Sequence, residues 1–186
     1  MDPTLRKTLF DAGQESPGAW LMKAMSLHAA AMRLDPVDAP VQANEGTTSL
    51  ASEHSMMLGM SFELLLKAII MINRLNAGAK EPLPKNLQVG HDLARLAAHP
   101  DCASAAVSTS EIAILEHLSP FIPWGGRYPY PKREADYEPL AWLSRNRPLQ
   151  MDFWTRLAEI VKEKGWVMKG GSSAAGGTKL MMRPRS

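Results

Sequence analysis

The segment MMLGMSFELLLKAIIMINRL, residues 56–75, decides the fold class because its apolar side chains surround a helix instead of forming one stripe. A helix that is apolar nearly all round is buried on most of its surface. We expect this helix to begin near Ser49 and to end near Asn76, because Gly78 offers a left-handed stop. The segment is therefore predicted to be the central helix of an all-α fold.

Further segments predict helices that pack around the central one, because their apolar residues repeat at the helical period. Ser16 can cap the first of them, and Pro17 suits its first position. Ser108 and Glu111 have the spacing of a capping box at the start of another. The helices are expected over residues 16–34, 91–99, 108–119 and 148–164.

The domain organisation follows from length and composition. A chain of 186 residues is long enough for one domain with a sizeable core. We expect an N-terminal extension over residues 1–15, a single helical bundle domain over residues 16–166, and a flexible tail rich in Gly and Ser over residues 167–186. No strand-length run alternates at a period of two residues, so no strand is predicted.

Charge and cysteine content indicate a cytoplasmic protein. The formal net charge of +2 is too small to argue for nucleic acid unless the basic residues cluster. Cys102 is the only cysteine, so the chain has no internal disulfide. The N-terminus lacks the apolar run of a signal peptide, and the most apolar run contains Glu63 and Lys67. We therefore predict no membrane span.

Metal and cofactor binding are not predicted. The histidines do not form a pair with ligand spacing; they are His28, His54, His91, His99 and His117. The glycine pairs lack the spacing and the preceding strand of a phosphate-binding loop. Neither a metal site nor a cofactor is therefore expected.

Glu63 and Lys67 are charged residues inside the most apolar helix, four positions apart on one face. Charges in such a place are retained when they are paired, so both side chains need partners. His91 or Asp92 can supply one. We interpret this set as a structural polar network that ties two helices together, in preference to a catalytic constellation.

The stretch WGGRYPYPKRE, residues 124–134, combines aromatic rings with basic side chains. Rings that stack on bases beside charges that hold phosphates are typical of single-stranded nucleic-acid sites. The candidate ligand-binding residues are Arg127, Tyr128, Tyr130, Lys132 and Arg133. The alternative interpretation is that the rings pack over one end of the bundle and fix the loop. Arg127 keeps its candidacy under both interpretations, because adjacent glycines allow an anion close to the backbone.

Three motifs in order resemble the helical HEPN domains of prokaryotes: FELLLKA at 62–68, GHDLARL at 90–96 and GRYPYP at 126–131. The resemblance implies an antiparallel, up-and-down helical bundle that is usually a homodimer. In active members the dimer cleaves RNA without metal, using an arginine followed a few positions later by a histidine. Other members bind nucleotides or partner a nucleotidyltransferase.

The chain departs from the active pattern at one place. Arg127 matches the arginine, but no histidine follows His117, and Lys132 and Arg133 stand where the histidine is wanted. Neither side chain is a good general base near neutral pH. Arg95 and His99, one helical turn apart, are the weaker catalytic candidates.

The sequence therefore predicts a non-catalytic, HEPN-like binding module for RNA or a nucleotide, as part of a toxin–antitoxin or stress-response system. One alternative is a metal-independent HEPN endoribonuclease that uses Arg127, or Arg95 with His99. The other alternative is a helical dimer with a purely structural or protein-interaction role, since methionines are abundant in the helices. The expected partners are a second copy of the chain, RNA or a nucleotide, and a nucleotidyltransferase.

Overall fold

The computed structural model describes residues 2, 4, 6, 7, 13, 16–35, 50–124, 140–164, 167–172 and 178–183, and this part of the chain is mostly helical. The first half contains α2 (Pro17–Arg33), α3 (Ala51–Asn76), α4 (Lys85–Gln88) and α5 (Leu93–Ala97). The second half contains the 3-10 helix η1 (Pro100–Ala105), α6 (Thr109–Leu118), α7 (Phe121–Trp124) and α8 (Leu140–Lys164), then β1 (Val167–Ser172) and β2 (Thr178–Arg183).

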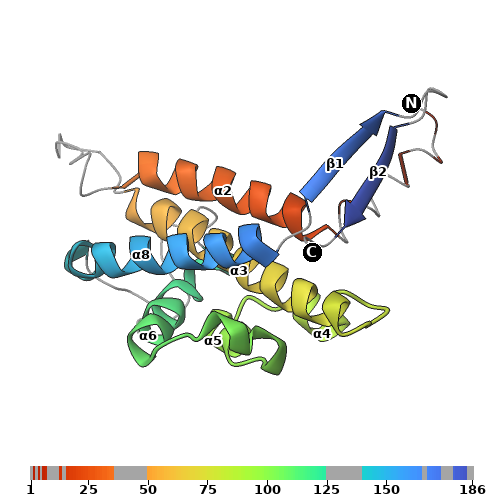
Figure 1. The fold of residues 1–186 in the computed structure, drawn as a ribbon. Helices are drawn as coiled ribbons and strands as arrows, with labels where there is room; N and C mark the ends of the chain where they lie inside the picture. Colours follow the sequence, from red (N-terminus) through yellow and green to blue (C-terminus); the bar gives the residue numbers. More distant parts are fainter. Residues whose placement is uncertain are drawn as a thin grey trace.

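Helix α3 is the central helix, as its apolar pattern predicts. It packs against α2, α5, η1, α6, α7 and α8. Figure 1 shows α2 along one side of α3 and the α5 and α6 region on the other, with α8 crossing in front. Its side chains from Leu65 to Ile72 are almost fully enclosed, including the charged Lys67. Burial of this apolar surface is the main favourable term in folding.

Helix α3 is also long and apolar enough to cross a membrane, by length and composition alone, and 78% of its most apolar window is buried inside the fold. The sequence predicts no such span because its most apolar run, residues 56–72, is short for the ~20 residues that a bilayer needs and contains Glu63 and Lys67. The full helix is longer than that run. The helices around α3 provide the apolar environment that its composition requires.

The structure confirms the predicted N-terminal caps of two helices. Ser16 Oγ accepts a hydrogen bond from the Ala19 amide at 3.2 Å, with Pro17 at the first helical position. Ser108 and Glu111 form the reciprocal capping box of α6. These caps satisfy backbone N–H groups that have no partner within the helix.

The last helix begins earlier than its sequence pattern predicts. Its apolar face is first evident at residue 148, whereas α8 begins at Leu140 and contains Pro148. A proline blocks one backbone hydrogen bond and commonly ends or kinks a helix, which is why the pattern misplaces the start. Asp35, only 3% exposed in its side chain, pairs with Arg147 at 3.0 Å and ties this first part of α8 to the end of α2.

The C-terminal region contains strands that the sequence does not predict. Strands β1 and β2 pair antiparallel, with Val167 opposite Arg183 and Ser172 opposite Thr178. Figure 1 shows this hairpin projecting from the helical body beyond α8. The expectation of no strand was wrong for these two segments. Alternating side chains mark a strand when one face is buried, whereas backbone pairing itself needs no such pattern.

Candidate ligand-binding groove and its polar network

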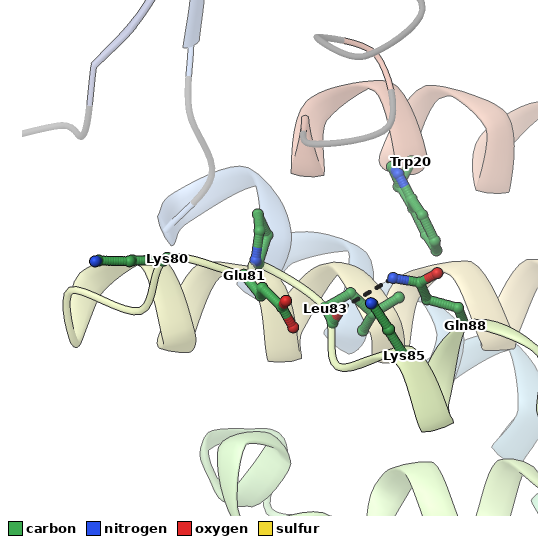
Figure 2. A pocket seen from close by; sticks show the side chains of 7 residues that line it. Trp20, Lys80, Glu81, Leu83, Lys85 and Gln88 are labelled. Carbon is green, nitrogen blue, oxygen red and sulfur yellow. Dashed lines mark hydrogen bonds between the residues drawn. The ribbon is translucent and has the colours of Figure 1, made fainter.

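A groove of about 390 Å³ lies between the start of α2 and the connection from α3 to α4. Figure 2 shows Trp20 pointing from α2 toward Gln88, with the Lys85 side chain next to Gln88 and Lys80 at the far end of the connection. The groove is lined by Trp20, Lys80, Glu81, Pro82, Leu83, Lys85 and Gln88. One aromatic ring and two ammonium groups therefore border one open cavity.

The α3–α4 connection is held in a defined shape by its own sequence. Gly78 adopts a left-handed backbone conformation, with φ +79°, directly after α3 ends. Leu83 and Leu87 are buried and anchor the connection in the core. Arg74 Nε donates to the Glu81 carbonyl at 3.1 Å. The buried leucines and the Arg74 contact hold the backbone from which the polar side chains of the connection line the groove.

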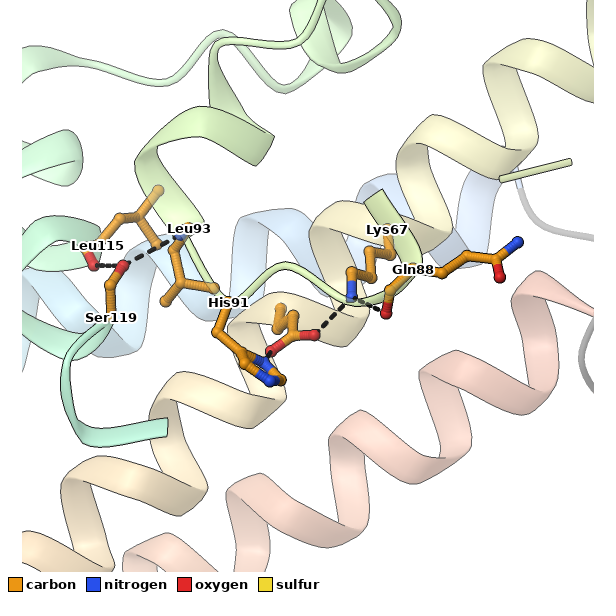
Figure 3. A network of polar contacts seen from close by, with 7 residues as sticks. Lys67, Gln88, His91, Leu93, Leu115 and Ser119 are labelled. Atoms are coloured by element: carbon orange, nitrogen blue, oxygen red, sulfur yellow. Dashed lines mark hydrogen bonds and ion pairs between the residues drawn. The ribbon is translucent and has the colours of Figure 1, made fainter. Parts of the chain in front are cut away.

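A buried polar network supports this connection from the core side. Lys67 Nζ lies 2.6 Å from Glu63 Oε1 and donates to the Gln88 carbonyl at 3.2 Å. His91 Nδ1 lies 2.9 Å from Glu63 Oε2. Figure 3 shows the Lys67 ammonium beside the Gln88 carbonyl, with His91 nearby. Lys67 and His91 each contact one oxygen of the Glu63 carboxylate. The network thus joins α3 to the residues on both sides of Val89.

The charges of this network differ in their exposure. The side chain of Lys67 is 2% exposed and that of Glu63 is 10% exposed, whereas the His91 side chain is 48% exposed. A buried ammonium without a carboxylate is very costly, so Glu63 is the partner that allows Lys67 to remain in the core. Because an ionised carboxylate only accepts hydrogen bonds, His91 carries a proton on Nδ1.

The segment after His91 is fixed in turn to α6. The Leu93 amide donates to Ser119 Oγ at 3.0 Å, and Ser119 Oγ donates to the Leu115 carbonyl at 2.7 Å (Figure 3). Asp92 does not join the Glu63 network as its predicted partner. Its Oδ1 caps α5 by accepting the Arg95 amide at 2.9 Å. A short aspartate side chain bonds readily to a backbone amide three residues later, and this contact keeps Asp92 at the start of α5 and away from Glu63.

Of the two weaker catalytic candidates, Arg95 and His99, the structure gives His99 a structural role. His99 is the N-cap of η1, and its Nδ1 accepts the Asp101 amide at 3.2 Å. The same nitrogen lies 3.7 Å from Asp101 Oδ2, but a nitrogen that accepts an amide proton cannot also donate to the carboxylate. Arg95 is exposed on α5. The capping role of His99 gives no support to proton transfer by this pair.

The predicted ligand-binding residues of the basic aromatic stretch are Arg127, Tyr128, Tyr130, Lys132 and Arg133, and all five lie outside the described residues. Within the described ranges no group of three or more His, Cys, Asp and Glu side chains is arranged to hold a metal. Cys102 is buried, and burial raises the pKa of its thiol to about 12. A thiol with so high a pKa is not a nucleophile near neutral pH.

A second polar cluster lies where α2, α3 and α8 meet. The rings of His28 and Trp154 stack with centroids 3.9 Å apart, and Trp154 Nε1 donates to Ser61 Oγ at 3.1 Å. His54 is buried and its Nδ1 donates to the Ala31 carbonyl at 2.8 Å. Burial, followed by the charge of His54, lowers the pKa of His28 to about 4. The cluster is a packed contact between three helices.

The groove was missed by sequence reasoning because its parts are far apart in the chain. In the sequence, Trp20 is one of several apolar residues on a predicted helix. Lys80 and Lys85 are two charged residues in a loop that contains prolines. No local spacing relates α2 to that loop. The usable signal in the sequence is Lys67 itself: an ammonium group in the middle of an apolar helix needs polar partners, so some other segment must pack over this part of α3.

No protein-family model matches this chain, and comparisons with curated proteins and with solved structures gave no significant match either. Functional inference therefore rests on the groove, on the network and on the motifs of the sequence.

Proposed function

We propose that this chain is a non-catalytic, cytoplasmic binding module for RNA or a nucleotide, built on a HEPN-like antiparallel helical bundle. The observation that carries the proposal is the groove in which the Trp20 ring and the Lys80 and Lys85 side chains line one cavity. An aromatic face for a base and ammonium groups for phosphate are the two elements that single-stranded nucleic-acid sites combine.

The size and charge of the groove favour a small or single-stranded ligand. A volume of about 390 Å³ is at the lower end of the range of small-molecule sites. Lys80 and Lys85 contribute two positive charges and Glu81 one negative charge, so the lining has a charge of 2 − 1 = +1. This excess is suited to one phosphate group, with the base held by stacking and not by charge.

The basic aromatic stretch extends the proposal beyond the groove. Arg127, Lys132 and Arg133 would hold phosphate, and Tyr128 or Tyr130 would stack on a base. Removing Arg127 is the direct test of this part: an Arg127→Ala chain that binds RNA as tightly as the unmodified chain excludes Arg127 from the site.

The assembly we propose is a homodimer, formed through helix faces rich in Met and Leu. Met22 and Met25 on α2 are 64% and 40% exposed, which supplies adaptable apolar surface. The resemblance to HEPN domains adds a nucleotidyltransferase as the second partner and a toxin–antitoxin or stress-response setting. Sedimentation of the purified chain tests the dimer, and a monomer at all concentrations would exclude it.

The proposed binding is tested with a fluorescent single-stranded RNA titrated at increasing salt concentrations. Binding should weaken as salt rises, because phosphate contacts release counterions. The double substitution Lys80→Ala and Lys85→Ala should weaken binding by at least about tenfold, since even one hydrogen bond to a charged group contributes roughly 1.5–3 kcal/mol. Lys23→Ala, an exposed position on α2 outside the groove lining, is the matched control. Absent or salt-independent binding would favour the protein-interaction alternative.

The contact between His91 and Glu63 favours the endoribonuclease alternative, so the experiments must also test for RNA cleavage. His91 is half exposed and is oriented by the buried Glu63 carboxylate, an arrangement that also suits a general base. We expect no RNA cleavage by the chain in the presence of a chelator. Cleavage that is abolished by His91→Ala or by His99→Ala, and that survives an unrelated substitution such as Lys23→Ala, would overturn the non-catalytic assignment.

A further inference from the structure

We propose that the groove selects nucleotides whose base carries an exocyclic amino group, and that the side-chain oxygen of Gln88 makes the selection. This inference rests on the proposed function, because it assigns a base preference to the same groove. Gln88 lines the groove together with Trp20, so a base that stacks on the indole lies within reach of the Gln88 amide.

The orientation of the Gln88 amide is set by the protein. Its Nε2 donates to the Leu83 carbonyl at 3.2 Å, and a carbonyl only accepts hydrogen bonds. The amino end must therefore face Leu83, which leaves Oε1 on the side away from it. In Figure 2 Trp20 points toward Gln88, and the Gln88 oxygen is turned away from Leu83. The group presented to a stacked base is an acceptor.

The backbone of Gln88 is fixed as well. Its carbonyl accepts from the buried Lys67, which is paired with Glu63, so the residue is tied to the core of α3. Leu87, its neighbour, is buried at 3% exposure. A side chain with its backbone and its amino end both held loses little freedom when it binds a ligand, so its oxygen discriminates well.

The remaining groove groups are consistent with this selection. The Glu81 carboxylate is a second acceptor, and the only other charged groups of the lining are the Lys80 and Lys85 ammonium groups, which suit phosphate. A base with a carbonyl oxygen at this place would put two acceptors against each other. Such an unsatisfied contact is costly, whereas an amino group donates to Gln88 Oε1.

The experiment compares adenosine monophosphate with inosine monophosphate, which carries a carbonyl where adenosine carries an amino group. Isothermal titration of the full chain should show adenosine monophosphate binding about fivefold to tenfold more tightly, as expected for one hydrogen bond. Cytidine and uridine monophosphates form a second pair with the same prediction. Both comparisons use the unmodified chain and do not depend on the folding of a variant.

Substitution assigns the preference to Gln88. In a Gln88→Leu chain the ratio of the two affinities should fall to about one, because the acceptor is lost while Trp20 and Lys85 remain. Asn86→Leu is the matched control, since Asn86 is an exposed amide on the same helix outside this groove lining, and it should keep the ratio.

The outcomes separate this inference from the function on which it rests. Equal affinity for both members of each pair, with binding that Lys85→Ala weakens, would overturn the base preference and leave nucleotide binding in the groove intact. A preference that persists in Gln88→Leu would overturn the assignment to Gln88. Binding of none of the four nucleotides would overturn nucleotide recognition by the groove itself.

Discussion

At the scale of single residues, Glu63 is the side chain on which the buried network depends. It contacts Lys67 through one carboxylate oxygen and His91 through the other. The two ends of the network are not equivalent, because Lys67 is enclosed whereas His91 is half exposed to water. Without Glu63, the buried Lys67 ammonium has no carboxylate partner. Without Lys67, the Glu63 carboxylate still contacts His91.

This asymmetry predicts unequal effects on stability. Glu63→Leu should lower the free energy of unfolding by about 3 kcal/mol, since it leaves the Lys67 ammonium buried without a carboxylate. Lys67→Met, which removes the ammonium and keeps the apolar stem, should cost less than half as much. Urea unfolding followed by circular dichroism measures both values. Equal costs for the two substitutions would contradict the assignment of Glu63 as the central partner.

At the scale of elements, the packing of α3 against the α6–α7 corner depends on a missing side chain. A Cβ at Gly59 would lie 3.0 Å from Ile122 Cγ1 and 3.2 Å from the Leu118 carbonyl oxygen. Both distances are shorter than ordinary contacts, and one of the two neighbours is backbone. The glycine therefore lets α3 and this corner approach closely, at a cost in helix propensity.

Gly59→Ala should destabilise the fold by about 1–2 kcal/mol. The gain of about 1 kcal/mol in helix propensity is outweighed by overpacking against Leu118 and Ile122. Thermal unfolding compares it with Gly90→Ala, where a Cβ would meet only the Asn86 carbonyl oxygen at 3.8 Å. A Gly59→Ala chain that is as stable as the unmodified chain would show that the corner relaxes freely.

A second junction between elements ties α6 to α8. Arg156 Nη2 lies 2.7 Å from Glu111 Oε1, and Arg156 Nη1 donates to the Ala105 carbonyl. Burial by itself would raise the pKa of Glu111, but hydrogen bonds from Ser108 and Arg156 hold that pKa below its ordinary value. Glu111 thus links the cap of its own helix to α8, 45 residues later in the chain.

At the scale of the whole molecule, the pKa values predict a fold that loses stability in mild acid. Burial lowers the pKa of His117 to about 4, and burial with the nearby His54 lowers that of His28 to about 4. The unfolded chain, with an ordinary value of 6.5, binds more protons between these limits. The stability is therefore complete above about pH 6.5 and decreases as pH falls toward 4.

We expect the free energy of unfolding to decrease between about pH 7 and about pH 5, by less than about 1.4 kcal/mol per pH unit for each imidazole, because both rings retain some solvent screening. The lowered pKa of Glu111 adds to the loss at still lower pH, since its contribution is complete above the ordinary value of 4.5 and is lost as pH falls through the lowered pKa. His28→Phe, which preserves a ring against Trp154, should flatten the pH dependence. Urea unfolding at several pH values measures it, and a pH-independent stability over this interval would contradict the prediction.

The sequence by itself determined those features that depend on neighbours within a few turns. The period of apolar residues identified α3 as the buried helix, and the caps at Ser16 and Ser108 followed from short spacings. The i, i+4 spacing placed Glu63 beside Lys67. These features are local because a helix repeats every 3.6 residues and satisfies its own backbone.

Only the tertiary structure decided which distant groups complete those features. His91 and the Gln88 carbonyl lie 28 and 21 residues from the charges that they contact, and no spacing rule selects them over Asp92. The same holds for the groove, where Trp20 meets the α3–α4 connection, and for the pairing of β1 with β2. Such long-range contacts form only when the chain packs into its complete fold, because each depends on how apolar surfaces from many elements fit together.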